Sequence, residues 1–310
     1  MSAAAGVTSP PLLAPAALRI WIALGIVYVV WGSTYLAIRV MVETIPPLLG
    51  AGLRFLIAGA LLVGVLSVTR GWAAVRPTRR QIAGALLIGL LLPGANAVVT
   101  VAEVDVPSAL AALLIATVPL ILILLRRVTG ERIAPASWIG VVIGFAGVGL
   151  LLAPGERPDG ATLLGMLLCV AAACMWASGS FVASRIDLPD AAIVSVGWQM
   201  LLGGIPITVA GVLAGEVADV GPMSLDSVLA FAYLVLIGSL IAYTAYAWLL
   251  RNVPVSKVGT YAYVNPAIAI LLGWLILDET ITGLALTGAA IIIASVALVV
   301  RAESAPRRGR

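Results

Sequence analysis

Ten apolar segments, joined by short polar or proline-containing turns, dominate this chain of 310 residues. An α-helix needs about 20 mostly apolar residues to cross the hydrocarbon core of a bilayer, which is about 30 Å thick. We therefore expect an all-α integral membrane protein with ten transmembrane helices. The predicted spans are residues 20–40, 47–68, 82–101, 107–125, 134–152, 161–183, 190–213, 227–250, 254–277 and 281–300.

The composition excludes several classes of protein. Hydrophobic residues make up 62% of the chain and charged residues 10%, whereas soluble domains are about 45–50% apolar and about 25% charged. This excludes a soluble enzyme, a disordered protein and a nucleic-acid-binding protein. The chain has no histidine, which rules out histidine acid–base catalysis and histidine metal ligands. Cys169 and Cys174 lie in one apolar run and are interpreted as packing residues, so we expect no metal and no cofactor.

The basic residues indicate the topology. If both termini are cytoplasmic, 15 of the 18 Lys and Arg residues fall in cytoplasmic joins or tails. Arg157 falls in an outer join, and Arg39 and Arg54 lie within spans. Cytoplasmic joins are enriched in Lys and Arg, so we expect a multi-pass protein of the inner (cytoplasmic) membrane with both termini inside. We expect residues 1–18 to form a disordered tail and residues 302–310 a basic cytoplasmic tail.

The two halves of the chain resemble each other. Several positions in the first half have a partner 145 to 148 residues later. The pairs are Trp31 and Trp176, Ser33 and Ser178, Arg54 and Gln199, Pro119 and Pro266, and Glu131 and Glu279. They define repeats at residues 19–152 and 161–301, with five spans each. Because five is odd, the second repeat must enter the membrane from the opposite face, and inverted repeats are typical of secondary transporters.

Short motifs in both halves resemble a known family. Residues 31–35 (WGSTY), the proline pair 46–47, the pair 54–55 (RF) and residues 130–132 (GER) are similar to the EamA repeat of the drug/metabolite transporter superfamily. Residues 261–266 (YAYVNP) and 278–280 (DET) resemble the matching second repeat, and residues 99–108 are similar to YedA-type exporters within that family. The resemblance implies a ten-helix inner-membrane exporter with a central substrate cavity. Substrates of the superfamily range from amino acids to drugs and sugars.

Polar and aromatic side chains inside the spans fall on common helix faces. Two stripes with the spacing i, i+4 and i+7 lie in symmetry-related spans. They are Asn96, Thr100 and Glu103, and Ser239, Tyr243 and Tyr246. Polar groups that face lipid are costly, so such stripes indicate protein contacts or water. The candidates for substrate binding are Trp31, Ser33, Tyr35, Asn96, Thr100, Trp176, Ser178, Gln199, Ser239, Tyr243, Tyr246, Tyr261 and Asn265. The alternative for each is a contact between helices of the bundle.

Arg54 is a charge within a span, and two interpretations of it stay open. It lies roughly 10 Å below the outer end of its span at 1.5 Å per residue. Its guanidinium could bind a substrate carboxylate. It could instead be a structural charge that reaches toward the surface or bonds main-chain carbonyls, and this is the interpretation we adopt.

Glu103 is the candidate for coupling transport to protons. It is the one carboxyl that adjoins a polar stripe, and histidine is absent. Closing the outer mouth over Glu103 would desolvate it and raise its pKa. The alternative is that Glu103 ends its helix in solvent. Pro93, Pro119 and Pro266 are hinge candidates, because a proline removes one helical hydrogen bond.

Gly140, Gly144 and Gly147 form a small-residue face on the fifth span. We expect this face to pack closely against the tenth span, which carries Gly283 and Gly288. A homodimer seam is the alternative use of such a face, although we expect a monomer.

Together these features predict a secondary transporter that exports small organic metabolites or drugs by alternating access. An aromatic, hydroxyl-rich cavity with little fixed charge suits neutral, zwitterionic or amphipathic solutes, amino-acid-like ones included. The expected partners are this solute and the lipid bilayer. The alternatives are a passive channel or facilitator, a membrane receptor and an intramembrane enzyme. An enzyme is disfavoured because no Asp or Glu lies in the middle of a span, and a primary pump would need a nucleotide-binding loop.

Overall fold

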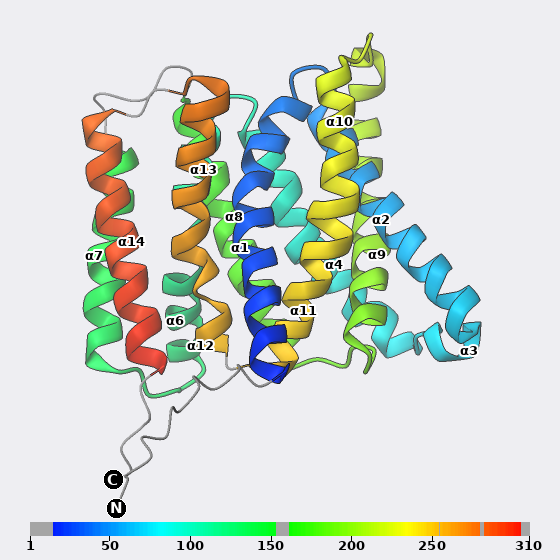
Figure 1. The fold of residues 1–310 in the computed structure, drawn as a ribbon, viewed down its shortest axis with the longest axis horizontal. Coiled ribbons are helices and arrows are strands. Elements are labelled where there is room, and N and C mark those ends of the chain that lie inside the picture. The colour runs from blue at the N-terminus through cyan, green and yellow to red at the C-terminus, as the bar shows by residue number, and fades with distance from the viewer. Residues whose placement is uncertain (1–14, 153–160, 254, 280–281, 305–310) are drawn as a thin grey trace, which may run out of the picture.

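The computed structural model describes residues 15–152, 161–253, 255–279 and 282–304, and every regular element within them is a helix (Figure 1). The first half contains α1 (Pro15–Met41), α2 (Pro47–Arg70), α3 (Trp72–Val75), α4 (Arg79–Ala102), α5 (Ser108–Ile115), α6 (Val118–Val128) and α7 (Pro135–Leu152). The second half contains α8 (Leu163–Ala183), α9 (Ala192–Leu213), the 3-10 helix η1 (Glu216–Asp219), α10 (Leu225–Tyr233), the π-helix η2 (Leu234–Ile241), α11 (Ala242–Asn252), α12 (Val255–Val258), α13 (Tyr261–Leu277) and α14 (Gly283–Ser304).

The helices lie where the apolar segments predicted them. Within the described residues, nine helical segments are at least 18 residues long and apolar enough to cross a bilayer, with α5 joined to α6 and α10 joined to α11. The tenth apolar segment is α13, which has 17 residues. The chain is therefore a multi-pass membrane protein. Residues 15–18 and 302–304, predicted as tails, belong to α1 and α14, and the rest of the predicted tails lies outside the described residues.

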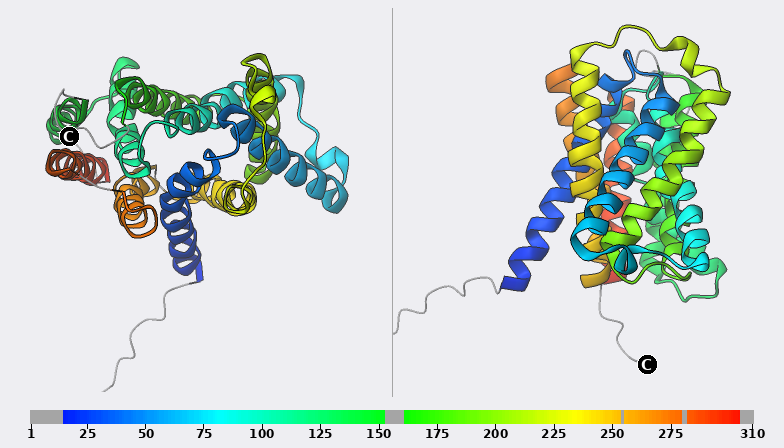
Figure 2. Two further views of the ribbon diagram at one scale, coloured as in Figure 1. Left: turned by 90° about the horizontal axis from the view of Figure 1, so that it is seen from above. Right: turned by 90° about the vertical axis from the view of Figure 1, so that its right-hand side faces the viewer.

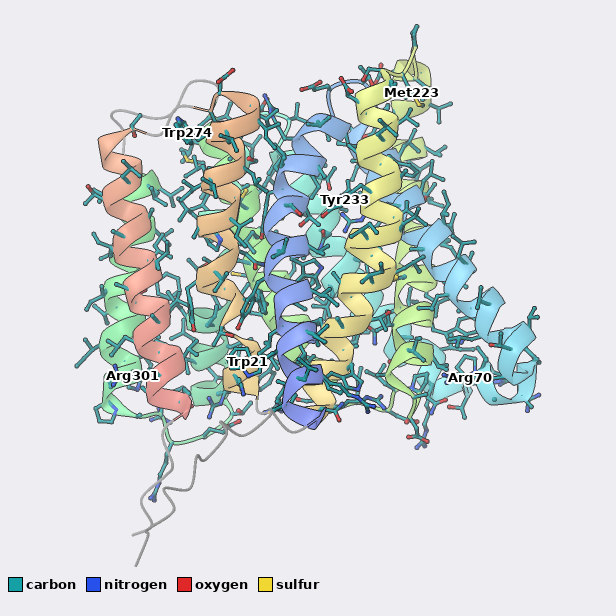
Figure 3. The ribbon with its side chains drawn as sticks, in the orientation of Figure 1. Trp21, Arg70, Met223, Tyr233, Trp274 and Arg301 are labelled. Atoms are coloured by element: carbon teal, nitrogen blue, oxygen red, sulfur yellow. The ribbon has the colours of Figure 1, made fainter. Side chains whose placement is uncertain are left out.

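The helices form one bundle whose two ends differ (Figures 1 and 2). The first turn of α1 and the last turn of α14 lie at the same end (Figure 1). Arg70 and Arg301 mark this end in Figure 3, and Met223 and Trp274 mark the other. The helix ends on the first side carry Arg70, Arg79, Arg126, Arg185, Arg251 and Arg301. We call this side the basic end and the other side the opposite end.

Matched helices of the two halves run in opposite directions. α1 begins at the basic end and leads away from it (Figure 1). α8, which holds the counterpart of the Trp31 segment, ends just before Arg185 and so runs toward the basic end. This is the relation expected between the first helices of two inverted repeats.

Glycines allow the closest helix contacts. α7 packs along α14 in both views of the bundle (Figures 1 and 2), as the glycine pattern predicted. A Cβ on Gly144 would lie 2.6 Å from Ser295 Oγ, and one on Gly147 would lie 3.3 Å from the Gly288 carbonyl oxygen. The glycine face of α7 is thus filled by α14 of the same chain. α2 and α9 cross just as closely, because a Cβ on Gly59 would overlap the main chain of Leu201.

Three of the membrane segments are irregular. A turn at residues 116–117 separates α5 from α6, and Pro119 lies in the first turn of α6. A turn at residues 259–260 separates α12 from α13. Pro93 and Pro266 lie inside α4 and α13. η2 is a π-helix. π-Helices are rare in proteins, and those that occur are often found at functional sites. The turn at residues 116–117 is buried by protein, whereas η2 carries buried residues such as Gly238 and exposed ones such as Leu236.

Candidate substrate pathway

A large cavity of about 750 Å³ enters the bundle from the basic end. Its mouth is lined by Arg126, Glu131, Arg185, Arg251 and Glu303. Its walls include apolar residues such as Leu92, Leu122, Val196 and Leu250, and its floor carries Gln199, Tyr243, Tyr246 and Tyr261. A mostly apolar cleft with a few polar groups at its base is typical of a small-molecule site.

The charges at the mouth are paired and partly hydrated. Arg126 Nε lies 2.8 Å from Glu131 Oε2 and Arg126 Nη1 lies 2.6 Å from Glu303 Oε2. Arg185 Nη2 lies 3.1 Å from Glu131 Oε1. These side chains are 14–43% exposed, so each pair contributes no more than about 1 kcal/mol. The pairs can therefore be rearranged at little energetic cost.

Five aromatic rings from four helices close the floor of the large cavity. They are Trp31 of α1, Trp176 of α8, Tyr243 and Tyr246 of α11, and Tyr261 of α13, and we call them the aromatic layer. The Trp31 ring centroid lies 4.8–6.0 Å from the centroids of the other four rings. Such edge-on ring contacts each add about 0.5–1.5 kcal/mol beyond the burial of area.

Hydrogen bonds orient the layer and leave one hydroxyl unused. Trp31 Nε1 donates to the Gly238 carbonyl at 3.3 Å, on the π-helix η2. Trp176 Nε1 donates to the Tyr261 hydroxyl at 3.2 Å. Tyr243 lines the large cavity, and its buried hydroxyl has no hydrogen-bond partner within the described residues. This hydroxyl is therefore a buried donor and acceptor that the described chain leaves unused.

A small cavity of about 50 Å³ lies beyond the aromatic layer. It is lined by Trp31, Thr34, Tyr35, Ile38, Arg54, Ala95, Asn96, Val99, Ile115, Ala172, Trp176, Tyr261 and Asn265. Trp31, Trp176 and Tyr261 belong to the layer as well, so the rings stand between the two cavities. The repeat predicted from the sequence pairs Arg54 with Gln199, and the structure places Arg54 at the small cavity and Gln199 at the large one.

At the opposite end of the bundle, a carboxylate binds a helix N-terminus. Glu279 accepts hydrogen bonds from the Ser108 amide at 2.8 Å, the Ser108 hydroxyl at 3.0 Å and the Ala109 amide at 3.2 Å. These donors form the first turn of α5, where a negative charge is favourable. The bonds fasten the end of α13 to the start of α5. Glu131, the sequence partner of Glu279, instead lies in the open mouth at the basic end.

Glu103 is buried beside this closure. Its side chain is fully buried, and neither carboxyl oxygen has a hydrogen-bond partner in the described part of the chain. Arg39 Nη1 donates to the main-chain carbonyls of Glu103 at 2.5 Å and Val104 at 2.7 Å rather than to the carboxylate. Burial raises the pKa of Glu103 well above its ordinary value, and Glu279 adds to this, while Arg39 and Arg54 act in the opposite direction. A neutral carboxyl is therefore favoured in this conformation.

The structure gathers most of the predicted substrate-binding residues at the two cavities. Gln199, Tyr243, Tyr246 and Tyr261 line the large cavity, and Trp31, Tyr35, Asn96, Trp176, Tyr261 and Asn265 line the small one. The four others line neither of these cavities. Ser33 contacts the Tyr233 hydroxyl at 2.7 Å, Thr100 donates to the Asn96 carbonyl at 2.9 Å, Ser239 accepts from Arg54 Nε at 2.9 Å, and Ser178 is half-buried.

Some lining residues were not singled out from the sequence. Thr34 lines the small cavity, and Ser195 lines the large one and accepts from Gln199 Nε2 at 2.8 Å. Ser195 precedes Gln199 by four residues, so the same one-face rule that selected the stripes would have found it. The mouth residues Arg126 and Arg185 were counted for topology alone, because nothing in their spacing shows that they face each other.

Comparison with known proteins fits this architecture. The EamA-like transporter family matches residues 19–153 and 163–301. The chain belongs to this family. It is thereby a member of the drug/metabolite transporter superfamily.

Several family members are similar along most of their length. The protein named "Uncharacterized inner membrane transporter YedA" of Escherichia coli (strain K12) is 41% identical over 279 residues, 89% of each chain. The "Probable amino-acid metabolite efflux pump" of the same organism is 26% identical over 280 residues, 86% of this chain and 90% of that one. A solved crystal structure with 22% identity covers 93% of this chain and 98% of its own, with a TM-score of 0.63. The last likeness concerns the fold alone.

Proposed function

We propose that this EamA-family chain is a secondary transporter that exports small organic molecules across the inner membrane by alternating access. The observation that carries the proposal is the pair of unequal cavities on either side of the aromatic layer. One has about 750 Å³ and opens at the basic end, and the other has about 50 Å³ and lies beneath the closed opposite end. This is the arrangement expected of a carrier open to one side only.

The proposed topology is ten transmembrane helices in two inverted repeats, residues 19–152 and 161–301, with both termini in the cytoplasm. Two separate family matches support the two repeats, and the opposite directions of α1 and α8 support their inversion. Lys and Arg favour cytoplasmic joins, so the basic end is the cytoplasmic one. The large cavity then faces the cytoplasm, from which an exporter takes its substrate.

The cavity walls favour neutral, zwitterionic or amphipathic solutes, such as amino-acid-like metabolites or drugs. The two carboxylates that line the large cavity, Glu131 and Glu303, are at its mouth and pair with arginine. Its floor offers the rings of Tyr243, Tyr246 and Tyr261 and the Gln199 amide. The printed name of one relative, an amino-acid metabolite efflux pump, supports the amino-acid-like class.

To release the solute at the opposite end, the rings of the aromatic layer and the helices of that end must separate while the basic end closes. The turns at residues 116–117 and 259–260 and the π-helix η2 are the breaks at which segments can tilt, because the helical ladder is already interrupted there. Pro119 follows the turn at residues 116–117 and Pro266 lies in α13, which follows the turn at residues 259–260, whereas Pro93 lies inside α4. The mouth pairs of Arg126 and Arg185 are weak enough to exchange partners during closure.

Counterflow in proteoliposomes tests the proposal. Vesicles holding the purified full chain are loaded with one unlabelled solute at a time, and uptake of a trace of the same labelled solute is followed. A carrier gives uptake that saturates and depends on the internal load. Uptake that rises linearly with concentration and ignores the load would establish a passive channel instead.

A further inference from the structure

Arg54 is a buried charge that forms no salt bridge with a described residue, although Glu103 is near enough to act on it electrostatically. Its side chain is 3% exposed, and no carboxylate of the described residues lies within 4.0 Å of it. Its Nε donates to Ser239 Oγ at 2.9 Å and its Nη1 to Asn96 Oδ1 at 3.5 Å, both neutral acceptors. Within the described chain Nη2 makes no hydrogen bond. An unpaired charge inside a membrane protein is costly and marks a functional site by default.

The two structural roles considered for Arg54 do not match this geometry. The side chain does not reach the surface, because it is buried. It does not bond a main-chain carbonyl either, because both of its acceptors are side-chain oxygens. Arg54 instead lines the small cavity, as Trp31 and Trp176 do. No carboxylate is among the residues that line this cavity.

We propose that Arg54 binds a carboxylate of the transported solute in the small cavity. This proposal rests on the exporter function above and narrows its substrates to carboxylic acids and zwitterions with an apolar body. The planar guanidinium presents two parallel N–H groups that match a carboxylate. The cavity has about 50 Å³, room for a group of a few heavy atoms, since one water occupies about 30 Å³ in the liquid. The apolar body of the solute must therefore lie among the rings.

The two positions paired by the proposed repeat indicate the direction in which the solute moves. Gln199, the position related to Arg54, offers a neutral amide to the large cavity, whereas Arg54 offers a positive charge beyond the aromatic layer. A carboxylate at the floor of the large cavity is attracted by its charge to the far side of the layer. When the rings of the aromatic layer separate, the carboxylate of the solute therefore passes first and its apolar body follows.

Matched acid and amide probes test the anchor by counterflow. The probes are 3-phenylpropionate with 3-phenylpropanamide and phenylalanine with phenylalaninamide. In the wild-type chain each acid should have a kcat/KM at least about tenfold above that of its amide, the difference expected from one charge-assisted hydrogen bond. Arg54→Gln should bring that ratio near one by lowering the rate of the acids, with the amides within about twofold of wild type.

Ser239→Ala is the matched control, because it removes the hydrogen bond to Nε and keeps the charge. It should retain the acid preference. Arg54→Lys keeps the positive charge but lacks the planar guanidinium, so its acid-to-amide ratio of kcat/KM should be intermediate. This variant also tests the proposal if Arg54→Gln does not fold. An unchanged preference in Arg54→Gln, or an equal loss in Ser239→Ala, would overturn the anchor.

The counterflow test with different solutes also distinguishes failure of the Arg54 proposal from failure of the proposed transport function. The wild-type chain should exchange solutes that carry a carboxylate at least about tenfold better than matched solutes that lack one. Saturable exchange of solutes that lack a carboxylate, at rates equal to those of the matched acids, would contradict the anchor and leave the exporter intact. Absence of counterflow with every solute would instead contradict the exporter itself.

Discussion

The large and small cavities lie on either side of the aromatic layer, and they differ in size, charge and closure. The large cavity opens between arginine and glutamate side chains that are partly exposed, and its floor is neutral. The small cavity lies under a closure made by Glu279 on the first turn of α5, and it holds the buried charge of Arg54.

The contacts at the two ends of the bundle differ in strength, and this difference favours one conformation over the other. A carboxylate that accepts three hydrogen bonds in a partly buried site is held more firmly than ion pairs at a hydrated mouth. The opposite end is therefore the more stable closure in this conformation. For the opposite end to open, Glu279 and the first turn of α5 would have to become hydrated while the arginine–glutamate pairs at the mouth become buried.

Removing the central ring should have the largest effect on the separation of the two cavities. Trp31→Ala deletes a ring that contacts four others and is 8% exposed. We expect a loss of about 3–5 kcal/mol in the free energy of unfolding and near-complete loss of counterflow. Thermal unfolding and counterflow of the purified chain measure both.

Trp274→Ala is the control for Trp31→Ala, because that ring is 61% exposed (Figure 3). It should change the unfolding free energy by less than about 1 kcal/mol. Equal losses in the two variants would show that the aromatic layer has no special role.

The two related glutamates should differ in their effect on closure. Glu279→Gln weakens three hydrogen bonds to α5, so we expect the closed opposite end to lose about 1.5–3 kcal/mol. Thiol labelling of an Asn96→Cys variant from that side should then rise roughly 10- to 100-fold. Glu131→Gln removes only partly exposed pairs and should change labelling less than about fivefold. The reverse order would contradict the assignment of the closed end.

Glu103 should make the closed end sensitive to pH. Its pKa is raised by burial, so the closed conformation is stabilised at low pH and loses that stability as pH rises through the raised value. Labelling of Asn96→Cys, divided by the thiolate fraction at each pH, should therefore increase with pH. Glu103→Gln should keep this corrected rate low at every pH, because the amide imitates the protonated acid. Glu43→Gln changes an exposed carboxyl at the same end and should leave the pH dependence unchanged; the same loss of dependence in both variants would rule out Glu103 as its source.

Hydropathy and helical spacing predicted much of this arrangement. Ten apolar segments gave the helices, and the glycines of α7 gave its contact with α14. Tyr243 and Tyr246 share a predicted face and both line the large cavity. The turns at residues 116–117 and 259–260 and the π-helix were not predicted, because hydropathy carries no information on the local hydrogen-bond register.

Spacing predicted a shared face but not the partner of each side chain. Thr100 has the stripe spacing, yet its hydroxyl bonds the carbonyl of its own preceding turn. Ser239 has the same spacing, yet it accepts from Arg54 across the bundle. A sequence gives no sign of which polar group is satisfied within its helix, and only the packed bundle shows that Arg54 is left facing a cavity.

Reciprocal access to the two cavities tests the central claim most directly. Single-cysteine variants Gln199→Cys and Asn96→Cys, in a chain lacking Cys169 and Cys174, are treated with a membrane-impermeant thiol reagent from either side. Gln199→Cys should react from the basic end and Asn96→Cys from the opposite end, and any condition that raises one rate should lower the other. Rates that rise together, or reaction of both variants from both sides, would contradict alternating access.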